Sequence, residues 1–149
     1  MIHYRFVFPR FHAGRAIDFI VRAQNSGAGW RSPANRSDGG TFVTGLCAMT
    51  LIRVEGILEV PSAALDGARD WLDHVADADG RAGYEKPGSD PVNRPGRNER
   101  FASHDTMTAI AMTCRMFMDR TRKDPRIVKG AGLLTDDLPA WDEPRIDFS

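Results

Sequence analysis

The chain has 149 residues, of which 42% are apolar and 27% are charged, a composition typical of one globular domain. Its 20 basic and 20 acidic side chains cancel, and no lysine- or arginine-rich run marks a phosphate-binding face, so nucleic-acid binding is disfavoured. No apolar run approaches the roughly 20 residues that a membrane span requires, and the start lacks the apolar core of a signal peptide. The cytoplasm is therefore the default compartment.

Residues 1–15 form a segment in which basic and aromatic side chains alternate before any acidic residue occurs. Its members are Tyr4, Arg5, Phe6, Phe8, Arg10, Phe11 and Arg15. We expect this N-terminal arm to pack over the open end of the helices that follow. The alternative is that the arm touches an anionic membrane surface, which would make the protein peripheral to a membrane.

Two units then follow one another along residues 16–118. Each unit is a helix, a glycine turn closed by an aromatic residue, and a second helix. The comparison pairs Trp30 with Tyr84 and Thr44 with Thr108, which leaves ten extra residues in the second unit, within the proline-rich loop 85–100. Repeats of this length predict stacked supersecondary units.

The two helices of a unit differ in character. The segment 62–78 is amphipathic, and we expect its acidic stripe of Asp66, Asp70, Asp73 and Asp77 to be a solvated outer surface. The segments 42–58 and 107–118 are apolar on nearly every side, as in a helix that other helices cover. Alternation of the two kinds predicts an all-α fold, a partial α/α toroid with about five helices in an outer and an inner layer.

A third unit begins at residues 125–134, followed by Trp141 just past the expected end of that helix. We interpret the chain as a fragment, a truncated relative, or a protomer that completes its ring by self-association. Cys47 and Cys114 both fall in apolar helical runs, where we expect free thiols.

The glycine turns resemble the glutamine-tryptophan repeat of the terpenoid cyclase and protein prenyltransferase superfamily, and of squalene-hopene cyclase-like proteins in particular. The residues that carry this resemblance are Gln24, Gly27 and Trp30 in the first unit, Asp79, Gly80 and Tyr84 in the second, and Trp141 in the third. The starts of the two inner helices also look like those of bacterial squalene-cyclase-like repeats. The resemblance covers about residues 16–148, and the expected repeat region is residues 16–149.

This resemblance implies an apolar cavity on the inner face that holds an isoprenoid chain. The residues expected to line it are Phe42, Leu46, Met49, Met107, Ile110 and Phe117.

Candidate catalytic residues are His104 and Asp105. Squalene cyclases carry an Asp-x-Asp-Asp-Thr-Ala motif at the start of an inner helix, and the matching stretch here is His104–Ala109, in which the proton-donor position does not hold an acid. Asp105 next to His104 could still form an acid–base pair, although we favour a helix cap. No metal site is expected: the ligand spacing of prenyltransferase zinc is missing, and residues 77–80 suit a turn better than a calcium loop.

The sequence therefore predicts a squalene-cyclase-like α/α repeat module without a cofactor, which binds an isoprenoid, a lipid or a partner chain rather than catalysing alone. One alternative is a terpenoid cyclase-type isomerase whose barrel is completed by oligomerisation, with Asp105 as the acid. The other is a protein-interaction scaffold.

Overall fold

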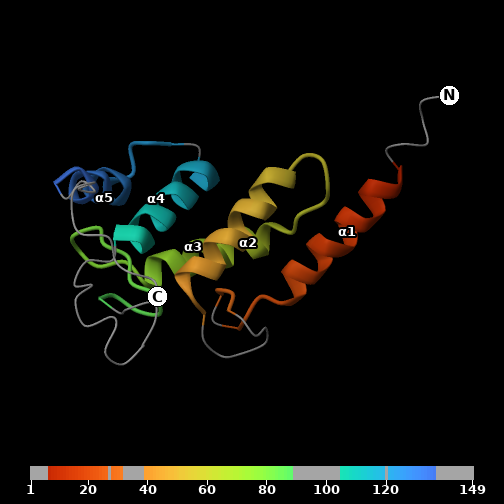
Figure 1. Ribbon diagram of the computed structural model, residues 1–149, viewed down its shortest axis with the longest axis horizontal. Helices are drawn as coiled ribbons and strands as arrows, with labels where there is room; N and C mark the ends of the chain where they lie inside the picture. Colours follow the sequence, from red (N-terminus) through yellow and green to blue (C-terminus); the bar gives the residue numbers. More distant parts are fainter. Residues whose placement is uncertain (1–6, 27, 32–38, 89–104, 120, 137–149) are drawn as a thin grey trace, which may run out of the picture.

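The computed structural model describes residues 7–26, 28–31, 39–88, 105–119 and 121–136, and in these the fold is all-α. Two isolated β-bridges, Glu55 with Leu58 and Ala76 with Ala82, are the extended pairings found among the described residues. The helices, shown in Figure 1, are α1 (Val7–Arg22), α2 (Thr41–Val54), α3 (Ser62–His74), α4 (Asp105–Asp119) and α5 (Pro125–Asp136). The expected all-α fold is confirmed.

The helix boundaries differ from the expected ones where the backbone turns. Helix α2 ends at Val54 rather than at residue 58, because Gly56 adopts a φ of +86° within the turn that follows. Helix α3 ends at His74, four residues early, because the glycine turn already begins at Val75. Helix α1 begins at Val7, so the second half of the expected arm is helical and continuous with the first unit.

The helices alternate between two layers, as expected for a partial α/α toroid. Helices α2 and α4 pack against each other as the inner layer, while α3 contacts both of them and α5 contacts α4. Helix α1 lies at one end of the molecule and α5 at the other (Figure 1). The core lies between the layers, and its fully buried side chains include Trp30, Leu51, Leu72, Val75 and Cys114.

The two glycine turns have the same hydrogen bonds at positions 52 residues apart. The N–H of Asn25 donates to the carbonyl of Gly29 at 2.9 Å, and the N–H of Asp77 donates to that of Arg81 at 2.9 Å. Ala28 and Gly80 occupy the same position in each turn, and both have a positive φ, of 72° and 92°. The turns are therefore structural copies of each other.

A threonine of the inner helix closes each turn. Thr44 Oγ1 accepts the N–H of Trp30 at 2.9 Å, across 14 residues of chain. Thr108 Oγ1 accepts the N–H of Ala82 at 3.1 Å, across 26 residues. The expected pairing of Thr44 with Thr108 is thus found in the structure, and we call these two bonds the threonine latches.

The expected pairing of Trp30 with Tyr84 is wrong. The turns and the latches show that equivalent residues of the two units differ by 52, so the counterpart of Trp30 is Ala82. Trp30 holds its own unit together: it is buried, and its Nε1 donates to the carbonyl of Ile20 in α1 at 2.7 Å. Tyr84 instead joins two units, since its carbonyl accepts the backbone N–H of Thr41 at 2.9 Å. The second unit consequently gains 12 residues between turn and latch rather than ten.

Candidate functional site

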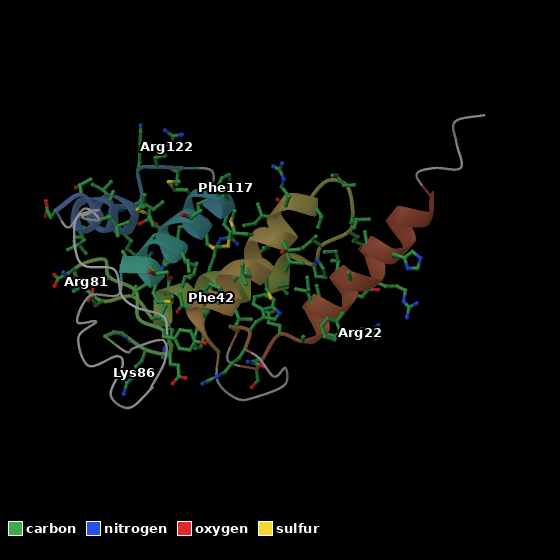
Figure 2. All side chains as sticks on the ribbon, viewed as in Figure 1. Arg22, Phe42, Arg81, Lys86, Phe117 and Arg122 are labelled. Atoms are coloured by element: carbon green, nitrogen blue, oxygen red, sulfur yellow. The ribbon has the colours of Figure 1, made fainter. Side chains whose placement is uncertain are left out.

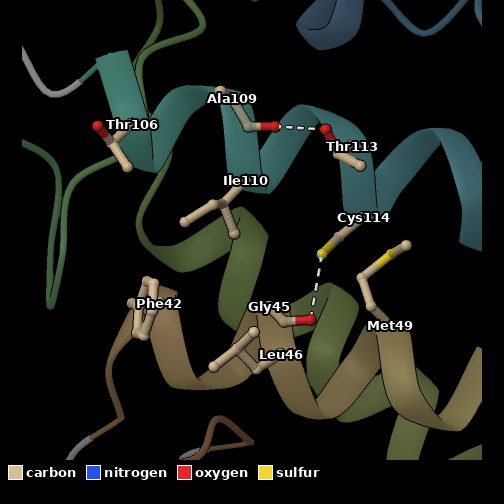
Figure 3. Close-up of a pocket in the computed structure, with 9 residues that line it drawn as sticks. All are labelled: Phe42, Gly45, Leu46, Met49, Thr106, Ala109, Ile110, Thr113 and Cys114. Carbon is tan, nitrogen blue, oxygen red and sulfur yellow. Dashed lines mark hydrogen bonds between the residues drawn. The ribbon is translucent and has the colours of Figure 1, made fainter.

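An apolar groove of about 300 Å³ runs between the inner helices on the side that faces away from α3 (Figure 3). We call it the inner groove. Helices α2 and α4 contribute all of its lining residues, which are Phe42, Gly45, Leu46, Met49, Thr106, Ala109, Ile110, Thr113 and Cys114.

A close contact between the two helices forms the floor of this groove. A Cβ on Gly45 would lie 2.3 Å from Cγ2 of Ile110, so only glycine allows α4 to approach this closely. The Cys114 thiol donates to the carbonyl of Gly45 at 3.7 Å at the same crossing (Figure 3). The walls are larger side chains, of which Phe42 and Leu46 are 46% and 58% exposed. Among the residues that the structure describes, no side chain covers this apolar surface.

The described lining residues carry no charge at neutral pH. Burial raises the pKa of the Cys114 thiol to about 11, and the nearby positive charge of Arg115 only partly opposes this, so the thiol is protonated. Thr113 Oγ1 donates to the carbonyl of Ala109 at 2.7 Å, which uses the hydroxyl proton within the helix. The groove thus offers van der Waals contact with little polar recognition.

Four of the six expected cavity residues, Phe42, Leu46, Met49 and Ile110, line the inner groove. Met107 does not, because it is buried at 4% exposure within the helix packing. Phe117 lies on α4 but is not part of the lining, and it is half-exposed. The sequence-based prediction missed the smaller lining residues, such as Gly45, Ala109 and Thr113. Their spacing was a usable signal, because Gly45 lies four residues before Met49 and Ala109 four residues before Thr113, which places each pair on one helix face.

The expected catalytic pair is only partly described. Helix α4 begins at Asp105, next to the groove residue Thr106, whereas His104 and the side chain of Asp105 lie outside the described residues. Gly27 and Trp141 of the repeat motif also lie outside them.

Gln24 is the motif residue whose side chain joins a turn to the next outer helix. Gln24 Nε2 donates to the carbonyls of Ala28 and Ala64 at 2.9 and 3.0 Å, which ties the first turn to α3. The second unit has no such glutamine, and there Lys129 of α5 donates to the carbonyl of Ala78 at 2.8 Å. The bridging side chain thus belongs to the turn in the first unit and to the outer helix α5 in the second.

Asp66, Asp70 and Asp73 of the acidic stripe are exposed, as expected, but two carboxylates of the stripe also make specific contacts within the fold. Asp73 pairs with Arg115 of α4 at 2.6 Å and also with Arg126 of α5, so one carboxylate joins three helices. Asp77 Oδ1 accepts the N–H groups of Asp79 and Arg81 at 2.9 and 2.8 Å, which is a turn cap. Arg115 is buried at 5% exposure in the second half of α4, and no sequence pattern identifies Asp73 as its partner.

Within the described ranges, no three His, Cys, Asp or Glu side chains are grouped so that they could hold a metal ion. None of the described helices is long and apolar enough to cross a membrane. Comparison of the chain with protein-family models, with characterised proteins and with solved structures found no match.

Proposed function

We propose that this chain is an α/α repeat module of the squalene-cyclase type, whose inner groove holds a flexible apolar ligand such as an isoprenoid or another lipid. The observation that supports this most is the groove itself: about 300 Å³ of apolar space, open to solvent, between two inner helices. That volume is at the lower end for small-molecule sites, which run from about 300 to 1,000 Å³. It suits a short apolar chain or one segment of a longer one.

The chemistry of the lining favours binding over catalysis by this chain alone. A thiol with a pKa of about 11 is neither a nucleophile nor a base at neutral pH. The threonine hydroxyl at Thr113 is bonded to its own helix. An apolar ligand would gain free energy here mainly through the surface that it removes from water, of the order of 25 cal/mol per Å².

The proposal is tested by displacing a fluorescent fatty acid, cis-parinaric acid, from the protein with farnesol. Leu46→Asp places a carboxylate in the groove wall, and we expect it to weaken probe binding at least tenfold, because the ligand would desolvate that charge. Ile57→Asp is the matched control, since Ile57 is 62% exposed in the loop after α2, away from the groove. Equal binding by both variants, or no binding by the unmodified protein, would contradict the proposal.

The cyclase-type alternative is separated from binding by product analysis. Incubation with squalene or a prenyl diphosphate should return the substrate unchanged. A product whose formation is lost in Asp105→Asn would instead favour catalysis with Asp105 as the acid.

The scaffold alternative is separated by the solution mass. If a second copy or a partner chain covers the inner groove, association should be abolished by Leu46→Asp and left intact by Ile57→Asp.

A further inference from the structure

The two ends of the inner groove differ in the side chains that lie beyond its lining. Helices α2 and α4 run in the same direction along the groove, so their first turns meet at one end and their last turns at the other (Figure 3). Figure 2 shows Phe42 and Phe117 at these opposite ends. We call the end at the last turns of α2 and α4 the C-terminal end of the groove.

The repeat shows which face of each inner helix forms the walls. The threonine latches make positions of α2 and α4 that differ by 64 equivalent. With this spacing, each lining residue of α2 has a counterpart on α4 that also lines the groove, from Phe42 with Thr106 to Met49 with Thr113. The same face of the inner helix is therefore used twice, once for each wall.

The next residue on this face is Arg53 in α2 and Phe117 in α4. Each follows the last of these wall residues, Met49 or Thr113, by four positions, which is about one turn on the same face. Side chains of a helix lean towards its N-terminus, so both can extend back over the C-terminal end of the groove. Arg53 is exposed, and Phe117 is 51% exposed. One wall thus continues into a cation and the other into an aromatic ring.

The positive charge of Arg53 is available to a ligand. No ion pair within the described part of the chain includes Arg53, and the nearest acid of α4 at this end, Asp119, is bonded to Arg69 of α3 at 3.0 Å. The last turns of α2 and α4 carry partial negative charge from the helix dipoles, so an anion needs a full positive charge beside it here. The planar guanidinium of Arg53 supplies that charge and matches a carboxylate with two parallel hydrogen bonds.

We infer that the inner groove takes an apolar chain that ends in a single carboxylate, with the carboxylate on Arg53 and the tail running towards Phe42. This inference rests on the proposed function and names the class of lipid, a fatty acid. One arginine balances one negative charge, and the described lining residues add no cation that would match a diphosphate. From Phe42 to Arg53 the α2 face is about 16 Å long, at about 1.5 Å per residue, which suits a chain of medium length.

Two ligands with the same chain and different head groups test this inference. Nile red, an uncharged fluorescent probe, is displaced from the protein by dodecanoic acid or by dodecanol at about pH 8, where a carboxylic acid is ionised. Arg53→Gln should weaken the binding of dodecanoic acid about fivefold, which is the contribution of a favourable exposed ion pair, and leave that of dodecanol unchanged. Arg53→Glu should weaken the acid further, because it places like charges together. Raised salt should reduce the difference between Arg53→Gln and the unmodified protein.

Arg22→Gln is the matched control. Arg22 is also an exposed arginine in the last turn of a helix, α1, and it does not line the inner groove, so this variant should bind both ligands like the unmodified protein.

The two head groups also separate the possible failures. If Arg53 only stabilises the end of α2, Arg53→Gln should weaken acid and alcohol equally, and that result would overturn the inference. Unchanged binding of dodecanoic acid by Arg53→Gln would overturn it as well, while binding of dodecanol would leave the proposed function in place. If the unmodified protein binds neither Nile red nor dodecanol, the proposed function itself is contradicted, and this inference with it.

Discussion

Gly45 of α2 and Ile110 of α4 lie so close together that a Cβ on the glycine would be 2.3 Å from the Cγ2 of the isoleucine. This contact fixes the distance between the inner helices and forms the floor of the inner groove. It also makes the glycine intolerant of change in a helix where alanine would otherwise be preferred.

Gly45→Ala should therefore destabilise the protein by about 1–3 kcal/mol, because the added methyl group overpacks the helix crossing. The matched control is Gly132→Ala on α5, where a Cβ meets nothing within 4 Å. The control should be stabilising by up to about 1 kcal/mol, which is the difference between the two residues in helix propensity. Urea unfolding measures both, and a neutral Gly45→Ala would show that the helices can move apart freely.

Ala28 and Gly80 should respond in opposite directions to exchange. Ala28 has a φ of 72°, which disfavours a residue with a Cβ, so Ala28→Gly should stabilise the fold by about 0.5–1 kcal/mol. Gly80→Ala should destabilise it by more than that, since a Cβ there would also lie 2.8 Å from Cβ of Lys129. Thermal unfolding of both variants checks this, and the same sign for the two would contradict the equivalence of the turns.

The threonine latches should depend on the hydroxyl group and not on side-chain shape. Thr44→Val keeps the shape but leaves the buried N–H of Trp30 without its acceptor, which should cost about 1–3 kcal/mol. Thr108→Val should have a similar effect through the N–H of Ala82. Thr44→Ser restores the acceptor and should recover most of the loss in chemical denaturation. Equal stabilities for the serine and valine variants would argue against the latch.

Cys114 should make stability fall at alkaline pH. Its pKa is about 11 in the folded chain because of burial, against about 8.5 for an exposed thiol. Above about pH 8.5 the unfolded chain loses this proton first, so the contribution is complete below that pH and is lost as pH rises towards 11. The unfolding free energy should fall more steeply between pH 8.5 and 11 in the unmodified protein than in Cys114→Ala, by up to about 3 kcal/mol at the upper end. Parallel curves would show that the thiol is not desolvated.

The sequence was sufficient for the helix order and for part of the groove. Inner helices with apolar residues on nearly every side could be told from amphipathic α3. The resemblance implied a cavity on the inner face, and four of the apolar residues expected to line it, Phe42, Leu46, Met49 and Ile110, line the groove. The equivalence of Thr44 and Thr108 was also correct, because a polar residue at the start of an apolar helix is easily recognised.

The pairing of aromatic residues failed for a physical reason. The turns share backbone hydrogen bonds and a residue with a positive φ, not a type of side chain. In the first turn that residue is Ala28, which the sequence does not mark as left-handed because it is not glycine. The Asp73 and Arg115 pair was missed similarly. Each residue is ordinary in its own helix, and only the packing of α3 on α4 brings the two charges within 2.6 Å.

The same latch closes over 14 residues in one unit and over 26 in the other. Loop length is thus uncoupled from the helical framework, in line with a closure cost that rises by only about 0.6 kcal/mol for each doubling of a flexible loop. Residues inserted into the longer connection, between Ala82 and Thr108, should therefore leave the helices in place. This connection is where variants of the protein can diversify and where an epitope can be grafted.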